Sequence, residues 1–262
     1  MAAIRPIARI AAALFAVVAS HAAAGEIAPA DRRSGADFMG PALRAMQDDD
    51  FANPGMLAVQ DGAALWREKA GAAGRACADC HGDAAASMKG IAARYPAFDE
   101  ASNAPIDLAG RINQCRAVRQ EAPAFDHEAA PLLALSAYLG SLSRGVPAAA
   151  GDDARLAPFV AAGKRLYEAR QGQLNLSCAA CHDDNWGKRL AGSVIPQAHP
   201  TGYPIYRLEW QAMGSLQRRL RNCLVGVRAE PYAYGAPEYV QLELYLMTRA
   251  RGMPMETPGV RP

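Results

Sequence analysis

The chain has 262 residues, with 28 lysines and arginines against 26 aspartates and glutamates and a formal net charge of +2. This length is enough for two small domains, each with its own core. The near balance of charge, without a basic arm or stripe, argues against a nucleic-acid-binding protein.

The first residues have the pattern of a secretory signal peptide. Arg5 and Arg9 form a basic start, an apolar run extends from Ile10 to Ser20, and Ala22–Ala24 offers a small-residue cleavage site. This run is too short to span a bilayer, and no later stretch is long and apolar enough. We therefore expect residues 1–24 to be removed and the mature chain to be periplasmic, without a membrane span.

After an extension over residues 25–60, a helix is expected where Gly62 is followed four residues later by Trp66. Next come the pentapeptide Cys77–His81 and a single Cys115. A second helix follows, because Leu132, Leu135, Leu139 and Leu142 recur with helical spacing and the pattern stops at Gly145 and Pro147.

The same order then repeats. Gly163 and Tyr167 stand 101 residues after Gly62 and Trp66, and the pentapeptide Cys178–His182 and a single Cys223 follow. Tyr239, Leu242 and Leu246 give the last helix. The sequence therefore predicts a mainly α fold with an N-terminal extension and two tandem class I cytochrome c-like domains from an internal duplication. The first, with the extension, covers residues 25–150 and the second residues 151–262, joined by a linker near residues 147–158.

The repeated pentapeptide has the form Cys-x-x-Cys-His, which is the attachment signature of c-type haem. Its two thiols bond the porphyrin and its histidine ligates the iron. Two copies predict two covalently bound haem c groups. The attachment residues are Cys77, Cys80, Cys178 and Cys181, and the histidine ligands are His81 and His182.

The second axial ligand decides the chemistry, because methionine raises the reduction potential of a haem whereas a thiolate stabilises ferric iron. Cys115 and Cys223 follow their motifs at similar positions and are the candidates that the repeat offers. A disulfide between them is the default for two exported cysteines. Their symmetric placement favours axial thiolates, Cys115 for the first haem and Cys223 for the second.

Arginines stand beside both single cysteines. If the segment is helical, Arg219 lies one turn before Cys223, where a guanidinium suits a sulfonate or sulfate oxyanion. Arg111 has the same relation to Cys115, so local spacing does not identify the reactive haem. Asp183, next to the second motif, is interpreted as a solvated loop acid.

Long strings of this sequence resemble the SoxA family, the c-type cytochrome subunit of the thiosulfate-oxidising SoxAX complex. They comprise Arg44–Gly55, both haem motifs, Pro200–Gln211 and Gly214–Cys223. The resemblance covers nearly all of the mature chain, and the complete first motif is similar to the two-haem form of the family.

The resemblance implies an enzyme, an L-cysteine S-thiosulfotransferase, that couples thiosulfate oxidatively to a cysteine of the carrier SoxYZ. It implies that Cys223 ligates the reactive haem and carries an extra sulfur as a persulfide, and that Arg219 binds substrate. It also implies that Cys115 ligates the first haem. The partners would be SoxX, which passes electrons onward, and a small electron-accepting cytochrome.

Three other interpretations stay open from the residues. A non-catalytic periplasmic dihaem electron carrier would show methionine where Cys115 and Cys223 stand. A dihaem peroxidase would need a histidine or an open iron site, for which His127 and His199 are available. A disulfide-linked structural subunit would leave both single cysteines unreactive to thiol labelling.

Overall fold

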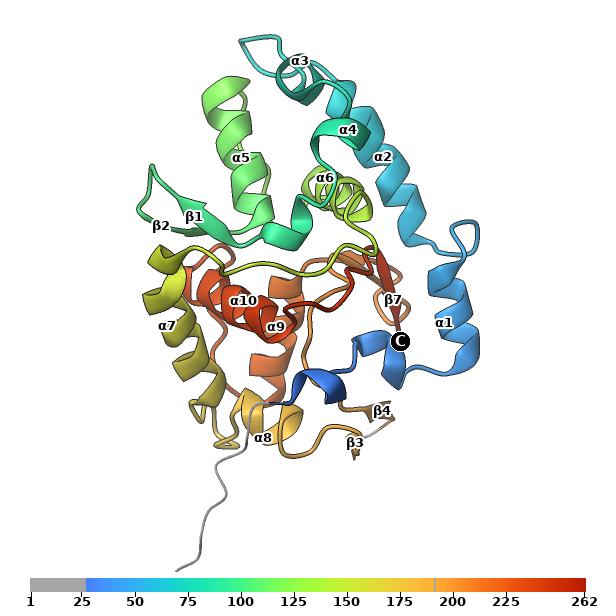
Figure 1. The fold of residues 1–262 in the computed structure, drawn as a ribbon, viewed down its shortest axis with the longest axis vertical. Helices are drawn as coiled ribbons and strands as arrows, with labels where there is room; N and C mark the ends of the chain where they lie inside the picture. The colour runs from blue at the N-terminus through green and yellow to red at the C-terminus, as the bar shows by residue number, and fades with distance from the viewer. Residues whose placement is uncertain (1–26, 191) are drawn as a thin grey trace, which may run out of the picture.

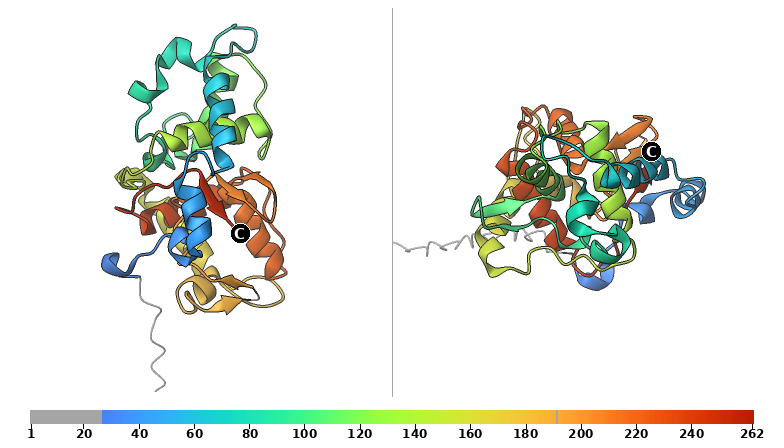
Figure 2. Two further views of the ribbon diagram at one scale, coloured as in Figure 1. Left: turned by 90° about the vertical axis from the view of Figure 1, so that its right-hand side faces the viewer. Right: turned by 90° about the horizontal axis from the view of Figure 1, so that it is seen from above.

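The computed structural model describes residues 27–190 and 192–262, so the predicted signal peptide at residues 1–24 lies outside the described residues. Two helical halves lie one above the other, the first at the top of Figure 1 and the second below it (Figures 1 and 2). This duplicated, mainly helical arrangement confirms the predicted fold class. No helix within the described residues is long and apolar enough to cross a membrane.

The two halves share one order of elements: a long helix, a motif helix, a hairpin, a helix with the single cysteine, and a terminal helix. The first half contains α2 (Gly55–Arg67), α3 (Cys77–His81), α4 (Ala84–Ser87), β1 (Ala97–Asp99), β2 (Ala104–Ile106), α5 (Leu108–Arg119) and α6 (Ala130–Ser141). The second contains α7 (Ala157–Glu168), α8 (Cys178–His182), β3 (Arg189–Leu190), β4 (Ser193–Val194), β5 (Ile205–Arg207), β6 (Ala212–Gly214), α9 (Leu216–Gly226) and α10 (Pro237–Arg249).

The glycines that begin each repeat allow the first and last helices of a half to cross in backbone contact. A Cβ on Gly62 of α2 would lie 2.1 Å from the carbonyl oxygen of Ala134 in α6. A Cβ on Gly163 of α7 would lie 2.0 Å from the carbonyl oxygen of Gln241 in α10. Any side chain there would force the helices apart, so glycine at these positions sets the crossing.

An antiparallel hairpin precedes each helix that carries a single cysteine. Strands β1 and β2 lead into α5, and β5 and β6 lead into α9. Each helix starts at a capping side chain, because Asp107 accepts a hydrogen bond from the Gly110 amide (2.6 Å) and Ser215 from the Arg218 amide (3.1 Å). The hairpins and caps therefore fix where the helices of the two single cysteines begin.

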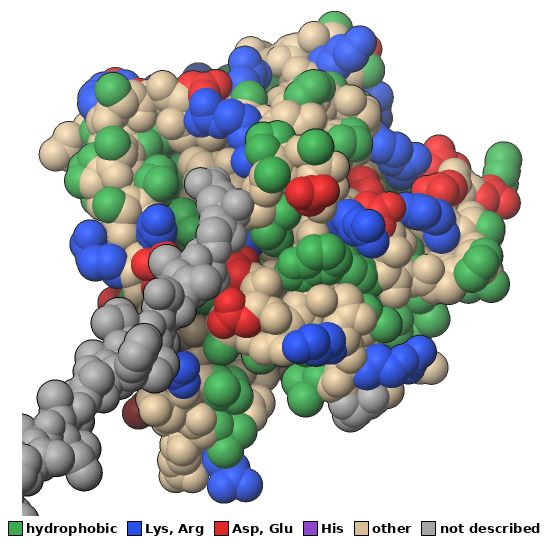
Figure 3. All heavy atoms as spheres, turned by 60° about the horizontal axis from the view of Figure 1, so that its bottom comes forward, with side chains coloured by type: hydrophobic (Ala, Val, Ile, Leu, Met, Phe, Trp, Pro, Cys, Tyr) green, Lys and Arg blue, Asp and Glu red, His purple; other side chains and the backbone are tan. Residues whose placement is uncertain are grey.

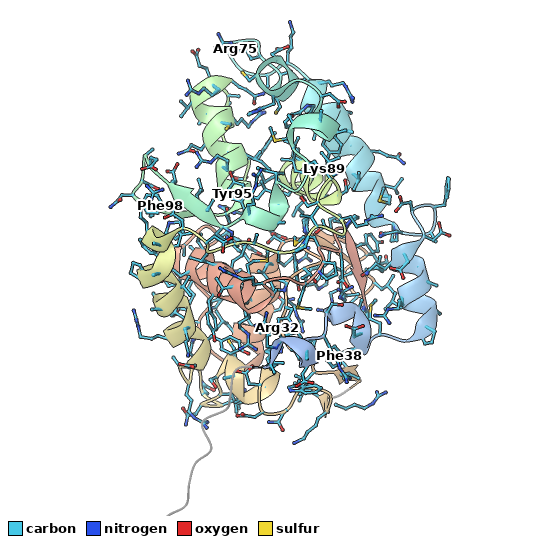
Figure 4. The ribbon with its side chains drawn as sticks, in the orientation of Figure 1. Arg32, Phe38, Arg75, Lys89, Tyr95 and Phe98 are labelled. Carbon is cyan, nitrogen blue, oxygen red and sulfur yellow. The ribbon has the colours of Figure 1, made fainter. Side chains whose placement is uncertain are left out.

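The extension packs against the second half. It forms the short 3-10 helices Pro29–Asp31 and Gly35–Phe38 and the helix α1 (Pro41–Asp48), while β7 (Gly259–Arg261) pairs in parallel with β5. Gln47 of α1 accepts a hydrogen bond from the Val260 amide (3.1 Å). Figure 4 shows Arg32 and Phe38 of this segment beside the second half. Residues 29–48 thus form a strap across the second half.

The halves meet over a small apolar cluster and a polar cavity. The cluster consists of Ala92, Ala93, Ala148, Ala150, Met247 and Met255. The cavity, of about 90 Å³, is lined in part by Asp107, His127, Glu128, Ser136 and Glu243. Residues of both halves contribute to the cluster and to the cavity, so the two halves pack directly against each other at this boundary.

Candidate functional site

The structure brings the first motif and its single cysteine to one cavity. A space of about 410 Å³ is lined by Cys77, Cys80, His81 and Cys115, with Trp66 and leucines on its walls. Gln120 lies 3.8 Å from the sulfur of Cys77 through its Nε2. Helices α3 and α5 supply the polar groups, and α6 supplies part of the apolar wall.

The second motif and Cys223 come together in the same way. A cavity of about 360 Å³ is lined by His182, Cys223 and Arg219, among other residues. The Nδ1 atom of His182 lies 2.6 Å from the carbonyl oxygen of Pro196, so the ring is oriented by its own loop. Cys115 and Cys223 therefore line separate cavities, each beside its own motif, and all six cysteines are free thiols in the structure.

The strap and the residues around β7 complete the second cavity. Gly35, Phe38 and Met39 of the strap line it together with Arg261. Phe38 also makes an edge contact with Trp186, with ring centroids 6.3 Å apart. The second cavity is thus closed by segments that have no counterpart around the first.

The pKa values of Cys178 and Cys223 reflect how close these thiols lie to each other and to charged side chains. Burial, followed by the charge of Cys223, raises the pKa of Cys178 to about 12. Burial acts to raise the pKa of Cys223 as well. A hydrogen bond from His182 and the positive charges of Arg219, His182 and Arg207 outweigh it, and the pKa of Cys223 is lowered. The Cys223 sulfur consequently faces both the motif histidine and a cationic wall.

In the first half, Arg111, the arginine one turn before Cys115, is paired with a carboxylate. Arg111 Nη2 forms an ion pair with Asp99 Oδ1 at 2.9 Å, and the Asp99 side chain is only 4% exposed. Arg111 also hydrogen-bonds Gln114, whose Nε2 lies 3.2 Å from Asp99 Oδ2. Hydrogen bonds from Ser102 and Gln114 and the charge of Arg111 hold the pKa of Asp99 below its usual value despite desolvation. The carboxylate is therefore ionised and cancels the guanidinium charge.

In the second half, the corresponding arginine, Arg219, has no such carboxylate partner among the described residues. Counting back from the two single cysteines, Arg207 of β5 occupies the position of Asp99 in β1, 108 residues earlier. Within residues 27–190 and 192–262, Arg219 forms no ion pair. Burial and the charge of Arg219 lower the pKa of Arg207, which pairs with the exposed Glu209 at 2.9 Å and donates through Nε to the Pro262 oxygen at 2.7 Å. Among the described residues, the arginine one turn before the single cysteine is therefore paired with a carboxylate in the first half and has no ion pair in the second.

The neighbouring arginines of α9 are engaged elsewhere. The Arg218 guanidinium lies 4.1 Å from the ring centroid of Trp210. Arg221 lies 4.6 Å from the ring centroid of Tyr234 and donates to the Tyr232 carbonyl. The arginines that line the second cavity are Arg189, Arg207, Arg219 and Arg261, of which Arg207 and Arg261 are paired with carboxylates. Over the face of the molecule in Figure 3, basic, acidic and hydrophobic side chains alternate.

The two alternative histidines occupy different places. His127 lines the cavity between the halves and stacks on Tyr234, with ring centroids 6.1 Å apart. His199 lines the second cavity, but its Nδ1 lies 2.8 Å from the Arg33 carbonyl oxygen. Burial lowers the pKa of His199 to about 4, so this ring is neutral at ordinary pH.

The interpretation of Asp183 as a solvated loop acid is wrong. Its side chain is 9% exposed, forms an ion pair with Arg249 at 2.5 Å and accepts a hydrogen bond from the Tyr167 hydroxyl at 2.8 Å. Sequence reasoning also missed Arg249 and Arg207. The available signal was the repeat itself, because these residues differ in charge from their counterparts Leu142 and Asp99.

The residues present fit a c-type haem in both cavities. The first cavity is lined by both motif thiols, the motif imidazole and Cys115. The second is lined by His182 and Cys223, and the thiols of Cys178 and Cys181 lie close enough to feel the charge of Cys223. Both volumes lie in the range of cofactor sites. In the second, His182 and Cys223 line the same cavity and would be the residues that ligate the iron. The fold and these two sites define a tandem c-type cytochrome.

Comparison with known proteins gives the family. A sequence model described as SoxA/TsdA, cytochrome c domain, matches residues 61–148 and again residues 162–255. The chain belongs to this family and, within it, to the SoxA proteins.

Individual relatives support the same family assignment. The chain is 39% identical to an L-cysteine S-thiosulfotransferase subunit SoxA of Pseudaminobacter salicylatoxidans, over 92% of this chain and 85% of the relative. It is 36% identical to the SoxA subunit of Rhodovulum sulfidophilum, over 87% and 80% of the two chains. A chain in the crystal structure of SoxXA from P. pantotrophus matches with a TM-score of 0.85 and 32% identity, over 88% of this chain and 87% of that one.

Proposed function

We propose that this chain is the catalytic cytochrome subunit of an L-cysteine S-thiosulfotransferase and holds two haem c groups. Cys77, Cys80, His81 and Cys115 would hold the first, and Cys178, Cys181, His182 and Cys223 the second. The relatives that carry this name span most of the chain, which supports the assignment. The proposed location is the periplasm.

The reaction joins thiosulfate to a cysteine of the carrier SoxYZ. A bond forms between the carrier sulfur and the outer sulfur of thiosulfate, the thiol loses one proton, and two electrons leave. The haem groups supply one-electron acceptance when bound. A SoxX subunit, as in the SoxXA complex of P. pantotrophus, and a small acceptor cytochrome would carry the electrons onward.

The single observation that carries the proposal is the difference in ion pairing between Arg219 and Arg111, each of which lies one turn before a single cysteine. Arg219 is free of carboxylate partners within the described part of the chain and lies beside Arg207, whereas Arg111 is paired with Asp99. Thiosulfate is a dianion whose sulfonate oxygens accept charge-assisted hydrogen bonds. Arg219 can therefore bind this anion, whereas Arg111 cannot do so without giving up its ion pair with Asp99.

Within the second cavity each residue has a separate task. Arg219 and Arg207 would hold the sulfonate end, and because Arg219 lies one turn from Cys223 on α9, the outer sulfur would be directed to the Cys223 sulfur. Cys223 would carry a sulfur as a persulfide. The carrier thiol would form its bond with the outer sulfur of the thiosulfate held beside Cys223.

The test replaces Cys223 with methionine in the protein co-expressed with SoxX, with Cys115→Met as the matched control. We expect Cys223→Met to abolish carrier-dependent thiosulfate oxidation and to remove one thiolate-haem signal. Cys115→Met should remove the other signal and leave the coupling reaction. Retention of activity and of both signals in Cys223→Met would exclude Cys223 as the reactive sulfur.

A further inference from the structure

Behind the second motif, the structure buries a charged cluster that the proposed reaction does not use. The Asp183 carboxylate, directly after His182, accepts hydrogen bonds from the Tyr167 hydroxyl (2.8 Å) and from Arg249 Nη2 (2.5 Å). Arg249 is only 3% exposed, and its guanidinium lies 4.7 Å from the ring centroid of Tyr167. Helices α7 and α10 and the end of α8 meet at this cluster.

The first half has a neutral arrangement at the same three places. Tyr167, Asp183 and Arg249 correspond to Trp66, Gly82 and Leu142. Trp66 Nε1 donates to the Gly82 carbonyl oxygen at 3.0 Å, and Leu142 packs against the apolar core of that half. The first half therefore packs these three positions without a charged side chain.

The ion pair is not explained by stability. Burying a guanidinium and a carboxylate costs several kcal/mol per ion before their attraction is counted, and a neutral pair of similar shape often holds a core equally well. The first half shows that a neutral set suffices in this fold. The second half instead has a buried ion pair at the residue that directly follows the histidine of its motif.

The cluster also reaches both ends of the loop that orients this ring. Asp183 starts the loop next to His182, and Pro196 near its end lies 2.6 Å from His182 Nδ1 through its carbonyl oxygen. Arg249 Nη2 lies 3.5 Å from the carbonyl oxygen of Gln197, the residue after Pro196. A single buried guanidinium thus contacts residues on both sides of the loop.

We propose that Arg249 and Asp183 are positioning residues for the second haem. They hold the loop that fixes the His182 ring, and their paired charges set the electrostatic field on the His182 side of that haem. The inference rests on haem attachment at the second motif, which the proposed function includes, and is independent of thiosulfate coupling.

The test uses the full chain with both haems and measures the reduction potential of each haem, without substrate. Asp183→Asn leaves the Arg249 cation unpaired, which disfavours ferric iron nearby, so the potential of the second haem should rise. Arg249→Met leaves the Asp183 carboxylate unpaired, so the same potential should fall. The first haem is the internal control and should not shift in either variant.

A triple variant guards against misfolding by an unpaired buried charge. Tyr167→Trp, Asp183→Gly and Arg249→Leu together copy the neutral set of the first half. We expect this variant to fold and to show a shifted low-spin electron paramagnetic resonance signal for the second haem only. Shifts of the potential in the same direction in both single variants, or an unchanged second-haem signal in the triple variant, would overturn the proposal. Loss of thiosulfate coupling alone would bear on the proposed function instead.

Discussion

The Asp107 carboxylate accepts a hydrogen bond from Nε2 of Gln217 at 2.9 Å, across the boundary between the two halves. Asp107 caps α5, which carries Cys115, and Gln217 lies in the first turn of α9, which carries Cys223. Gln217 Oε1 in turn accepts from the Gly235 amide at 2.8 Å. The two helices that carry the single cysteines are therefore joined at their N-termini by one buried amide.

Replacing Gln217 with alanine should lower the free energy of unfolding by about 1–3 kcal/mol, because it leaves one oxygen of Asp107 and the Gly235 amide without these partners. Denaturant unfolding of the haem-loaded protein measures this loss. Gln173→Ala, at an exposed position, serves as the control and should have no effect. Equal unfolding free energies for Gln217→Ala and the parent would show that the bond contributes nothing.

The stability of the protein should fall as pH rises above about 4.5 through the contribution of Glu243. Burial, followed by the charge of Asp107, raises the pKa of Glu243 well above its ordinary value of 4.5. The folded state then keeps a proton that the unfolded state releases, so unfolding becomes more favourable with increasing pH. The charged or titratable groups that share this cavity are Asp107, His127, Glu128, Tyr95 and Tyr203.

Glu243→Gln removes this contribution and leaves those neighbours in place. Relative to the parent, its free energy of unfolding should increase as pH rises above about 4.5, by up to about 1.4 kcal/mol per pH unit. Unfolding curves at several pH values measure the difference. Parallel pH profiles for the two proteins would contradict the prediction.

Arg219→Gln should reduce kcat/KM for thiosulfate by roughly tenfold to a hundredfold, since a hydrogen bond to a charged group contributes about 1.5–3 kcal/mol. The matched control is Arg111→Gln, at the same place before Cys115. It should leave the coupling rate unchanged and instead destabilise the fold, because it leaves the buried Asp99 unpaired. Equal losses of activity in both variants would show that the ion pair with Asp99 does not distinguish Arg111 from Arg219 in function.

Arg207→Asp copies the hairpin residue of the first half into the second. The new carboxylate would lie near Arg219, as Asp99 lies near Arg111, and should raise KM for thiosulfate by roughly tenfold or more. Asp99→Asn is the reciprocal control and should not alter thiosulfate kinetics. A KM unchanged by Arg207→Asp would remove Arg207 from the binding site and leave Arg219 alone in that role.

The helices were predictable because their signals are local. Gly62 with Trp66, and the leucines from Leu132 to Leu142, fall within α2 and at α6, and their copies fall within α7 and α10. The strands were not predicted, because segments of two or three residues have no measurable periodicity. The placement of the strap also escaped prediction, since contacts such as Gln47 with Val260 join residues more than 200 positions apart.

The sequence predicted that each single cysteine lies beside its own motif, and it did not predict the ion pairing around these cysteines. Spacing alone placed Cys115 and Cys223 beside their motifs, because the chain repeats itself. It could not rank Arg111 against Arg219, since the difference arises from the hairpin residues Asp99 and Arg207, which are 12 residues distant in sequence from those arginines. Pairing across a hairpin depends on tertiary structure, which local patterns do not contain.

The strap has a consequence for the order of assembly. The walls of the first cavity come from residues 65–139, a continuous stretch that is complete before the second half is synthesised. The second cavity takes its walls from residues 35–40 and 182–262, so it cannot close until these distant segments meet. The first cavity can therefore form while the chain is still emerging. The second must wait for residues near 262, which leaves Cys223 and His182 accessible for longer.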